Sequence, residues 1–379
     1  MAPPPWHLLL DVLLAERAEL AAEISRRMQR RLSVYRDIPI EDFERHVAAA
    51  MECAVALARA DVPRLSRRQT KVLEQVGEAQ AVLGAPVDEM LLAWRIGVDV
   101  LVERGVAAAP GFGLGDDQRL AFVRVTMAAG DVGMITTARA HRRAELERDR
   151  EAQDRRASLV RALLFGTGDP AELRARAKTY GLDPEGQYRA VRAQPAAGES
   201  WREVDRAIGL TDAARDGRGM SVLVDADLAG FQRDPPGDAS PGRAGVGPGV
   251  PLDRLAESFR LASRALHTMR AFRLAGTRDL AQLGLHAAVV ADADVGDALC
   301  RRYLAPLAES GSGPEIEATL REYLAAGAHV ETAAERLHIH PNTLRYRLAR
   351  FEVLAGAQLR DPLVQFELWW ALRRAVMDQ

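Results

Sequence analysis

Lysine and cysteine are nearly absent from this chain of 379 residues. Lys71 and Lys178 are the only lysines, so arginine carries almost all of the positive charge. GC-rich coding is the simplest origin of that bias. Its consequence is that nearly every basic site presents a planar guanidinium, which suits phosphates and guanine edges. Cys53 and Cys300 are too few and too far apart for a disulfide framework, which favours a reducing, cytoplasmic compartment.

An excess of one charge and long hydrophobic runs are missing as well. The 51 basic and 53 acidic residues give a formal net charge of -2, so a nucleic-acid partner would have to meet a local basic patch. The most nearly membrane-like stretch, Val87 to Ala109, contains six charged residues. Met1 to Pro5 has neither a basic region nor a cleavage site. We therefore expect no membrane-spanning helix and no signal peptide.

Residues that could carry catalysis are not arranged for it. No Ser/His/Asp or Cys/His set can be placed on the expected elements. His338 and His340 lack further ligands at the spacing of a metal site. We expect no catalytic residue, no cofactor and no bound metal, and hence no enzyme.

Apolar residues recur at helical spacing from residue 6 to residue 109, which predicts four helices packed as a bundle. The Gly-rich stretch Ala109–Gly115 interrupts this pattern, and a long helix is expected after it. We place a helical, sensor-like bundle over residues 1–140 and a charged helical linker over residues 141–157. The linker alternates charges of both signs, as in an exposed helix or a dimeric coiled coil, and both alternatives stay open.

Short strands and helices alternate in residues 158–310, which predicts an α/β domain. The strands are expected at Tyr188–Ala193 and Met220–Val224, and helices at Trp201–Ala214 and Leu252–Leu274.

The segment Arg233–Gly249 is rich in proline and glycine and is expected to be a loop or a flexible insertion. Within it, Ala244–Val246 could form a strand. Gly245, Gly247 and Gly249 make a Gly-x-Gly-x-Gly run. Because no Gly-Lys-Ser/Thr follows, a phosphate-binding P-loop is excluded and a flexible loop is expected.

Residues 311–379 are expected to be helical throughout, and their centre has the pattern of a helix-turn-helix motif. A short helix, Glu331–Leu337, is followed by a tight turn at His338–His340. A second helix, Pro341–Leu354, begins with the proline that a first helical turn tolerates.

The second helix would read DNA from the face opposite its apolar stripe, which is made of Leu344, Leu348 and Phe351. In such motifs the first residues of the second helix reach base edges, whereas flanking side chains hold phosphates. No acidic residue lies between Arg336 and Phe351, which gives the local basic patch that the overall charge hides. A purely structural helical hairpin is the alternative. We assign base edges to Asn342, Thr343 and Tyr346, phosphates to Arg345 and Arg347, either role to Arg350, and a phosphate contact to His340.

Motifs in the same segment resemble a known family. TLREYL, then AERLHIHPNTLRYRLARFE, then a DP dipeptide before a final apolar helix follow one another within Glu315–Val376. This order is similar to the C-terminal domain of the PucR/CdaR family of bacterial transcriptional regulators. The resemblance implies that Asn342–Arg350 contacts DNA. It also implies that a helix at Pro362–Val376 packs on the motif, with Trp369 and Trp370 in core or dimer contacts.

Two further segments bear weaker likenesses. LVRALLFG, AELRARAKTYGLD and PLDRLAESFRLASRAL are similar to the GGDEF-like domain that precedes this DNA-binding end, although no GGDEF or comparable acidic metal-binding turn is found. Without carboxylates to hold Mg²⁺, this domain is expected to be a catalytically inactive scaffold. APVDEMLLAWRIGVDVLVE resembles the helical sensor domain of RsbR-type stress proteins.

These patterns predict a multidomain, cytoplasmic transcriptional regulator. It would combine an all-α bundle, a degenerate GGDEF-like α/β domain over residues 158–310 and an all-α helix-turn-helix domain over residues 311–379. The expected partners are double-stranded DNA, further copies of the chain in a homodimer or higher even assembly, and a small-molecule effector in the apolar bundle core. The alternatives are a rigid dimerisation role for the bundle, or a stress-signalling scaffold whose bundle binds protein partners.

Overall fold

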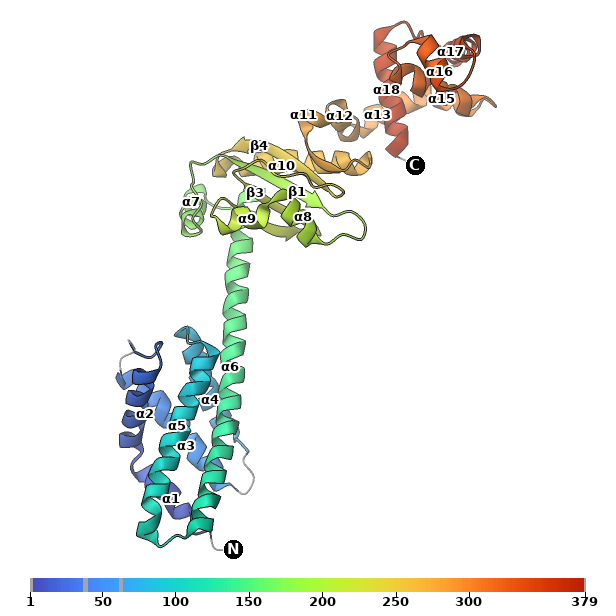
Figure 1. Ribbon diagram of the computed structural model, residues 1–379. Helices are drawn as coiled ribbons and strands as arrows, with labels where there is room; N and C mark the ends of the chain where they lie inside the picture. Colours follow the sequence, from blue (N-terminus) through green and yellow to red (C-terminus); the bar gives the residue numbers. More distant parts are fainter. Residues whose placement is uncertain (1–2, 37–39, 61–63, 378–379) are drawn as a thin grey trace. The chain divides into compact units, whose positions relative to one another are not determined.

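The chain separates into two compact units, an N-terminal unit (Met1–Asp154) and a C-terminal unit (Arg155–Gln379) (Figure 1). This is a computed structural model, and it describes residues 3–36, 40–60 and 64–377.

The N-terminal unit is a bundle of α-helices with one short 3-10 turn (Figure 1). The elements are α1 (His7–Ala15), α2 (Arg17–Arg31), α3 (Ile40–Arg59), α4 (Arg67–Val82), α5 (Val87–Ala108), η1 (Ala109–Phe112) and α6 (Asp116–Phe165). In the described part of this region five α-helices precede the Gly-rich break, so the prediction of four is wrong. The extra boundary falls at Glu16, where the backbone leaves helical geometry between α1 and α2. The leucine spacing continues past that point and gave no sign of it.

One apolar core joins α1, α2, α3, α5 and α6. Its largest fully buried side chains include Leu9, Leu13, Leu20, Tyr35 and Phe122. The Tyr35 hydroxyl donates to Gln80 Oε1 at 2.9 Å, which satisfies two polar groups inside the apolar core.

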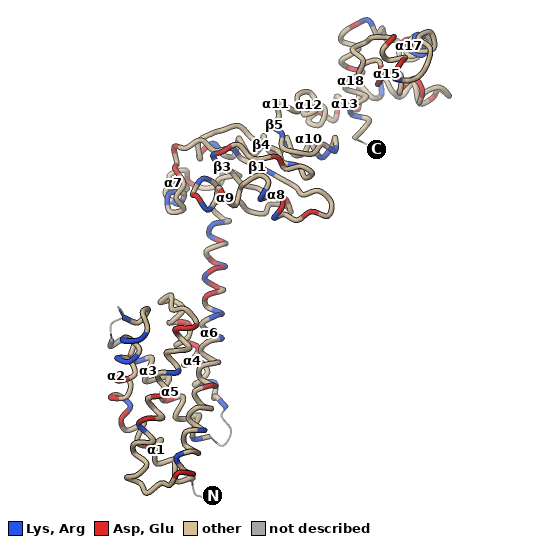
Figure 2. Tube along the Cα trace, in the orientation of Figure 1, with Lys and Arg blue, Asp and Glu red and all other residues tan. Residues whose placement is uncertain are grey.

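Helix α6 is 50 residues long and runs through the expected linker without a break, so the helical prediction for residues 141–157 is confirmed. Figure 2 shows both signs of charge alternating along it. Its first linker residue is an exception, since His141 is fully buried and its Nε2 lies 2.8 Å from the carbonyl oxygen of Ala85. For the linker of residues 141–157, both alternatives, an exposed helix and a dimeric coiled coil, remain open.

One 18-residue window of α6 reaches a mean hydropathy of 1.2, and 33% of that window is buried inside the structure. Length and composition alone would let such a helix cross a membrane. A core helix of a globular unit passes the same test, so the window is weak evidence.

The C-terminal unit begins with a mixed five-stranded sheet in the order β2-β3-β1-β4-β5. Strand β1 is antiparallel to β3 and β4, whereas β4 and β5 are parallel. The strands are β1 (Tyr188–Gln194), β2 (Gly219–Val224), β3 (Asp227–Gln232), β4 (Arg243–Val250) and β5 (Gly276–Asp279). The helices around them are α7 (Pro170–Thr179), α8 (Trp201–Ile208), α9 (Leu210–Arg215), η2 (Leu252–Arg254) and α10 (Leu255–Ala271).

Helices cover both faces of the sheet (Figure 1). Neighbouring residues of β1 point to opposite faces. Ala190 packs in one core with α10 and the end of α6, and Val191 packs in another with α8 and α9. The expected α/β layering is therefore present, although the sheet has more strands than were predicted.

Strand β4 confirms the strand suggested at Ala244–Val246 and extends it to Arg243–Val250, whereas residues 233–242 form a loop as expected. The expectation of a flexible loop around Gly245, Gly247 and Gly249 is therefore wrong. Gly245 and Gly247 are strand residues against which α10 lies very close. A β-carbon at Gly245 would lie 2.1 Å from the Ala262 carbonyl oxygen, and one at Gly247 would lie 2.1 Å from that of Ser258. The glycines thus mark a close backbone approach rather than flexibility.

The rest of the C-terminal unit is helical. Its helices are α11 (Leu280–Leu283), α12 (Leu285–Ala291), α13 (Ala293–Tyr303), α14 (Ala305–Ala308), α15 (Gly313–Ala325), α16 (Val330–Arg336), α17 (Pro341–Ala355) and α18 (Pro362–Met377). The core that α13 to α18 share contains Tyr303, Leu320, Leu344, Phe351 and Leu368. Trp369 of α18 packs edge-on against the ring of His286 in α12, so it lies in an intrachain contact.

Candidate nucleic-acid interface

Helices α16 and α17 form the predicted helix-turn-helix motif, with bounds within one residue of those expected. Ala333 and Ala334 are buried, and such small side chains allow α17 to cross α16 closely. In the turn, His338 has a φ of 51°, the left-handed conformation that reverses the chain in a few residues.

The faces of α17 are as predicted. Leu344 and Phe351 are fully buried and Leu348 is 8% exposed, all three in the core that α15 and α18 share. On the opposite side Tyr346 is 71% exposed. Asn342, Thr343 and Arg350 are also exposed. The side chains assigned to base edges are therefore free of the protein core.

His340 fixes the start of α17. Its Nδ1 accepts a hydrogen bond from the backbone N–H of Asn342 at 3.2 Å, which caps the helix. In a neutral ring the proton is then on Nε2, where it can be donated to a ligand. The exposed ring of His340 thus lies beside the first residues of the recognition helix.

The arginines of α17 differ in their surroundings. Arg345 donates to Glu331 Oε1 at 2.6 Å and to Asn342 Oδ1 at 3.2 Å. Arg347 is half-buried and donates to Thr319 Oγ1 at 3.4 Å. Arg350 is exposed. Counting arginines in the sequence missed these intramolecular partners, because Glu331 and Thr319 belong to other helices.

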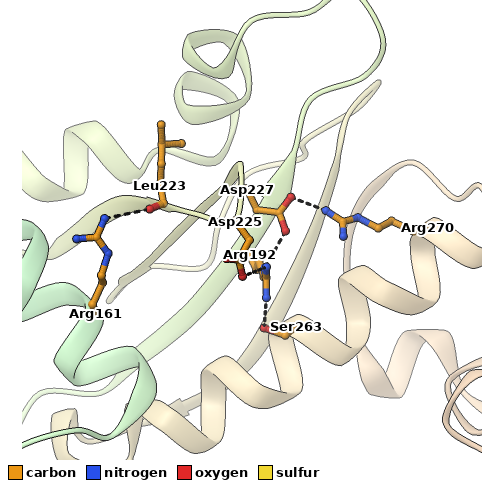
Figure 3. A network of polar contacts seen from close by, with 7 residues as sticks. All are labelled: Arg161, Arg192, Leu223, Asp225, Asp227, Ser263 and Arg270. Carbon is orange, nitrogen blue, oxygen red and sulfur yellow. Dashed lines mark hydrogen bonds and ion pairs between the residues drawn. The ribbon is translucent and has the colours of Figure 1, made fainter.

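A second polar cluster surrounds the turn between β2 and β3 (Figure 3). Asp227 is buried and accepts hydrogen bonds from Arg192 Nε at 2.8 Å and from the guanidinium of Arg270. Asp225 accepts from Arg192 at 3.3 Å. The turn therefore places two carboxylates close together, and arginines hold both of them.

Comparisons with known families match both ends of the chain. The PucR C-terminal helix-turn-helix domain matches residues 317–374, which include α16 and α17. The RsbT co-antagonist protein rsbRD N-terminal domain matches residues 18–156.

Curated relatives share shorter segments. The purine catabolism regulatory protein of Bacillus subtilis (strain 168) is 42% identical over 55 residues, which are 14% of this chain and 10% of that protein. An uncharacterized protein of Mycobacterium tuberculosis (strain ATCC 25618 / H37Rv) is 37% identical over 123 residues, or 31% of this chain. The match spans only 28% of that relative's length.

One solved structure, a regulator of polyketide synthase expression from Bifidobacterium adolescentis, matches 60% of this chain and 99% of its own. Its sequence identity is 20% and its TM-score is 0.30, which is too low to support an inference about the arrangement of the chain.

Proposed function

Because the chain carries a PucR-type helix-turn-helix domain and an rsbRD-type N-terminal domain, we propose that it is a sequence-specific, effector-controlled transcriptional regulator. The observation that carries this proposal is the exposed face of α17. Asn342 and Tyr346 lie opposite the buried Leu344 and Leu348, at the end of the helix that enters the major groove in such motifs.

Seven side chains are proposed to contact DNA. Their exposure and their place at the start of α17 support the base-reading role of three of them. Guanidinium chemistry suits the three arginines to phosphates, and Arg350 also to a guanine edge. The exposed ring of His340, at the start of the helix, supports a phosphate contact there. The base-reading residues are Asn342, Thr343 and Tyr346, and the remaining contacts are His340, Arg345, Arg347 and Arg350.

The regulator is proposed to act as a homodimer or a higher even assembly. One recognition helix reads only a few base pairs, and two helices related by a twofold axis double the site. Light scattering of the full chain should show an even oligomer. Monomers that retain full DNA affinity would contradict this.

The middle region is proposed to be a GGDEF-like domain without catalysis. The arginines around Asp225 and Asp227 support this, because guanidinium groups already neutralise the carboxylates that a divalent cation would need. Incubation with GTP and Mg²⁺ or Mn²⁺ should yield no cyclic dinucleotide. Product that survives repurification and disappears in Asp227→Ala would contradict it.

The N-terminal bundle is proposed to sense the effector, and the protein to be cytoplasmic. A second candidate function is a stress-signalling scaffold whose bundle binds protein partners. The match of residues 18–156 to the RsbT co-antagonist domain favours that alternative.

Genome-wide mapping of DNA bound by the chain in its own cells separates the two functions. The proposal expects the bound fragments to share a motif with twofold symmetry, and the purified chain to bind that motif. Fragments without a shared motif, or purified protein without affinity for them, would favour the scaffold.

A further inference from the structure

Helices α2, α3, α4 and α5 enclose a cavity of about 50 Å³ in the N-terminal unit. Roughly 10–15 Å³ is enough to hold one water molecule on this kind of measure. The space is therefore larger than an ordinary packing gap. Protein interiors are normally close-packed, so a cavity of this size calls for an explanation.

The wall of the cavity is almost entirely apolar. Phe43, Met51, Val76 and Leu101 are typical of it, and among the residues that the structure describes, none that lines the cavity is an Asp, Glu, Lys or Arg. An ionised ligand would leave its charge without a partner in this wall. The desolvation penalty of that charge is far larger than the free energy gained from apolar contacts. A neutral ligand is therefore required.

A few polar groups also line the cavity. Gln80 is one of them, and its side-chain oxygen already accepts from Tyr35, so its amide N–H groups are left to donate. His46 lines the cavity and is also exposed to solvent, so a ligand can enter the cavity beside it. The site therefore suits an apolar molecule with at most one hydrogen-bond acceptor.

Gly97 distinguishes this space from the other helix contacts of the unit. The other glycines within its α-helices up to residue 154 are Gly77, Gly105, Gly130 and Gly133. Each of them has a neighbouring atom within 2.4 Å of the place a β-carbon would take. At Gly97 a β-carbon would meet only Ile24, at an ordinary 3.9 Å. Glycine within a helix costs about 0.5–1 kcal/mol relative to alanine. Close packing explains that cost at the other four positions but not at Gly97, which faces the cavity.

Trp94 connects the cavity with α6. Trp94 is one of the residues that line the cavity, and its indole lies against Gly133, where a β-carbon would be 2.4 Å from Cη2. A ligand that shifts the indole therefore acts directly on the backbone of α6. That helix continues to Phe165.

We propose that this cavity is the effector site, that it takes a small neutral apolar molecule such as a single aromatic ring, and that Trp94 couples its occupancy to α6. The unbranched side chains of Met28 and Met51 line the wall and repack readily, so the cavity can widen to admit a ring. The inference rests on the proposed function in one respect, that a ligand controls the regulator.

The test uses the full chain, with toluene as the probe and benzoate as a charged molecule with the same ring. Toluene should raise the midpoint of thermal unfolding as its concentration rises, and benzoate should not, because only a ligand bound to the folded state stabilises it. No rise with toluene, or an equal rise with benzoate, would overturn the site.

Two valine variants test the position of the probe. Gly97→Val places methyl groups in the cavity and should weaken toluene binding about tenfold or more. Gly111→Val is the matched control, since a β-carbon at Gly111 has no atom within 4 Å. If Gly97→Val does not fold, Gly97→Ala is used instead and should also weaken toluene binding. Unchanged binding in the folded Gly97 variant would place toluene elsewhere and overturn the site.

Tryptophan fluorescence and DNA binding test the coupling. Toluene should change the emission of the wild type, and Trp94→Phe should lose most of that change while still binding toluene. Saturating toluene should also change the affinity for the mapped DNA motif. Toluene binding without an effect on DNA affinity overturns the effector role. Toluene binding by a chain that binds no DNA contradicts the proposed function but leaves the site standing.

Discussion

Arg345 of α17 donates to the carboxylate of Glu331 in α16 across 2.6 Å, which ties the recognition helix to the helix before it. The same guanidinium donates to the side-chain oxygen of Asn342. A phosphate that binds Arg345 must therefore compete with an internal carboxylate. We therefore expect the internal pair to lower affinity for DNA of any sequence and to hold Asn342 in place for the proposed base contact.

Glu331→Ala should therefore strengthen binding to DNA of any sequence. Release of Arg345 adds one phosphate contact, which should steepen the dependence of log K on log salt by about one. Glu335→Ala is the matched control, because it removes one exposed carboxylate from the same helix without an ion pair to Arg345. Equal effects of both variants on the salt slope, measured by fluorescence anisotropy, would mean that only net charge matters.

Leu348→Ala should act on stability rather than on DNA contact. Leu348 belongs to the core of the helix-turn-helix domain, and its truncation should lower the free energy of unfolding by about 2–5 kcal/mol through the cavity it leaves. Val353→Ala, on the same helix but 73% exposed, should have little effect. Denaturant unfolding of the two variants compares them directly. Unchanged stability in Leu348→Ala would mean that the buried and exposed faces of α17 are exchanged.

Asp227→Ala should destabilise the sheet region strongly. Its side chain is 2% exposed and faces Arg192, whose side chain is 18% exposed, so removal of the carboxylate leaves a largely buried guanidinium with only the exposed Asp225 as an ion-pair partner. The free energy of unfolding should fall by about 3–5 kcal/mol. Asp225→Ala removes the neighbouring carboxylate, which is 80% exposed, and should change stability much less. Comparable losses in both variants would contradict the role of burial.

Tyr303 should make the C-terminal core sensitive to alkaline pH. Burial, and then its hydrogen bond to Glu367, raise the pKa of its hydroxyl to about 12. An unfolded tyrosine ionises near pH 10. Because the folded pKa is the higher one, the stabilisation is complete below about pH 10 and is lost as pH rises through about 12.

Urea unfolding of the wild type and Tyr303→Phe checks this point. The difference in stability between the two proteins should shift in favour of the phenylalanine variant as pH rises through that window. A difference that does not depend on pH would exclude the ionisation of Tyr303 as its cause.

The recognition motif could be predicted from the sequence because all of its signals are local. The spacing of Leu344, Leu348 and Phe351 defines one face, and Pro341 marks the start of the helix. The partners of Arg345 and Arg347 could not be predicted, because charge counting along one helix says nothing about Glu331 or Thr319 on the helices that pack beside it.

The sheet was only partly predictable for the same reason. Strands β1 and β2 have apolar, β-branched patterns. Strands β3 and β4 contain glycines, which in a sequence suggest a loop. Gly230 lies against the Met220 carbonyl oxygen and Gly245 against that of Ala262, contacts that involve residues distant in sequence. The domain limits near residues 140, 157 and 310 stay predictions, as do the individual DNA contacts.

The central claim, that the exposed start of α17 reads DNA sequence, is tested most directly by anisotropy titrations of Asn342→Ala and Arg350→Ala. Both would be measured against the mapped motif and against a scrambled duplex, over a range of salt. Asn342→Ala should weaken the motif by about 1–3 kcal/mol, leave the scrambled duplex nearly unchanged and relax preference at one base pair. Arg350→Ala, if it holds a phosphate, should weaken both duplexes alike and lower the salt slope by about one. Equal loss on both duplexes for Asn342→Ala, or no loss on either, would contradict the account.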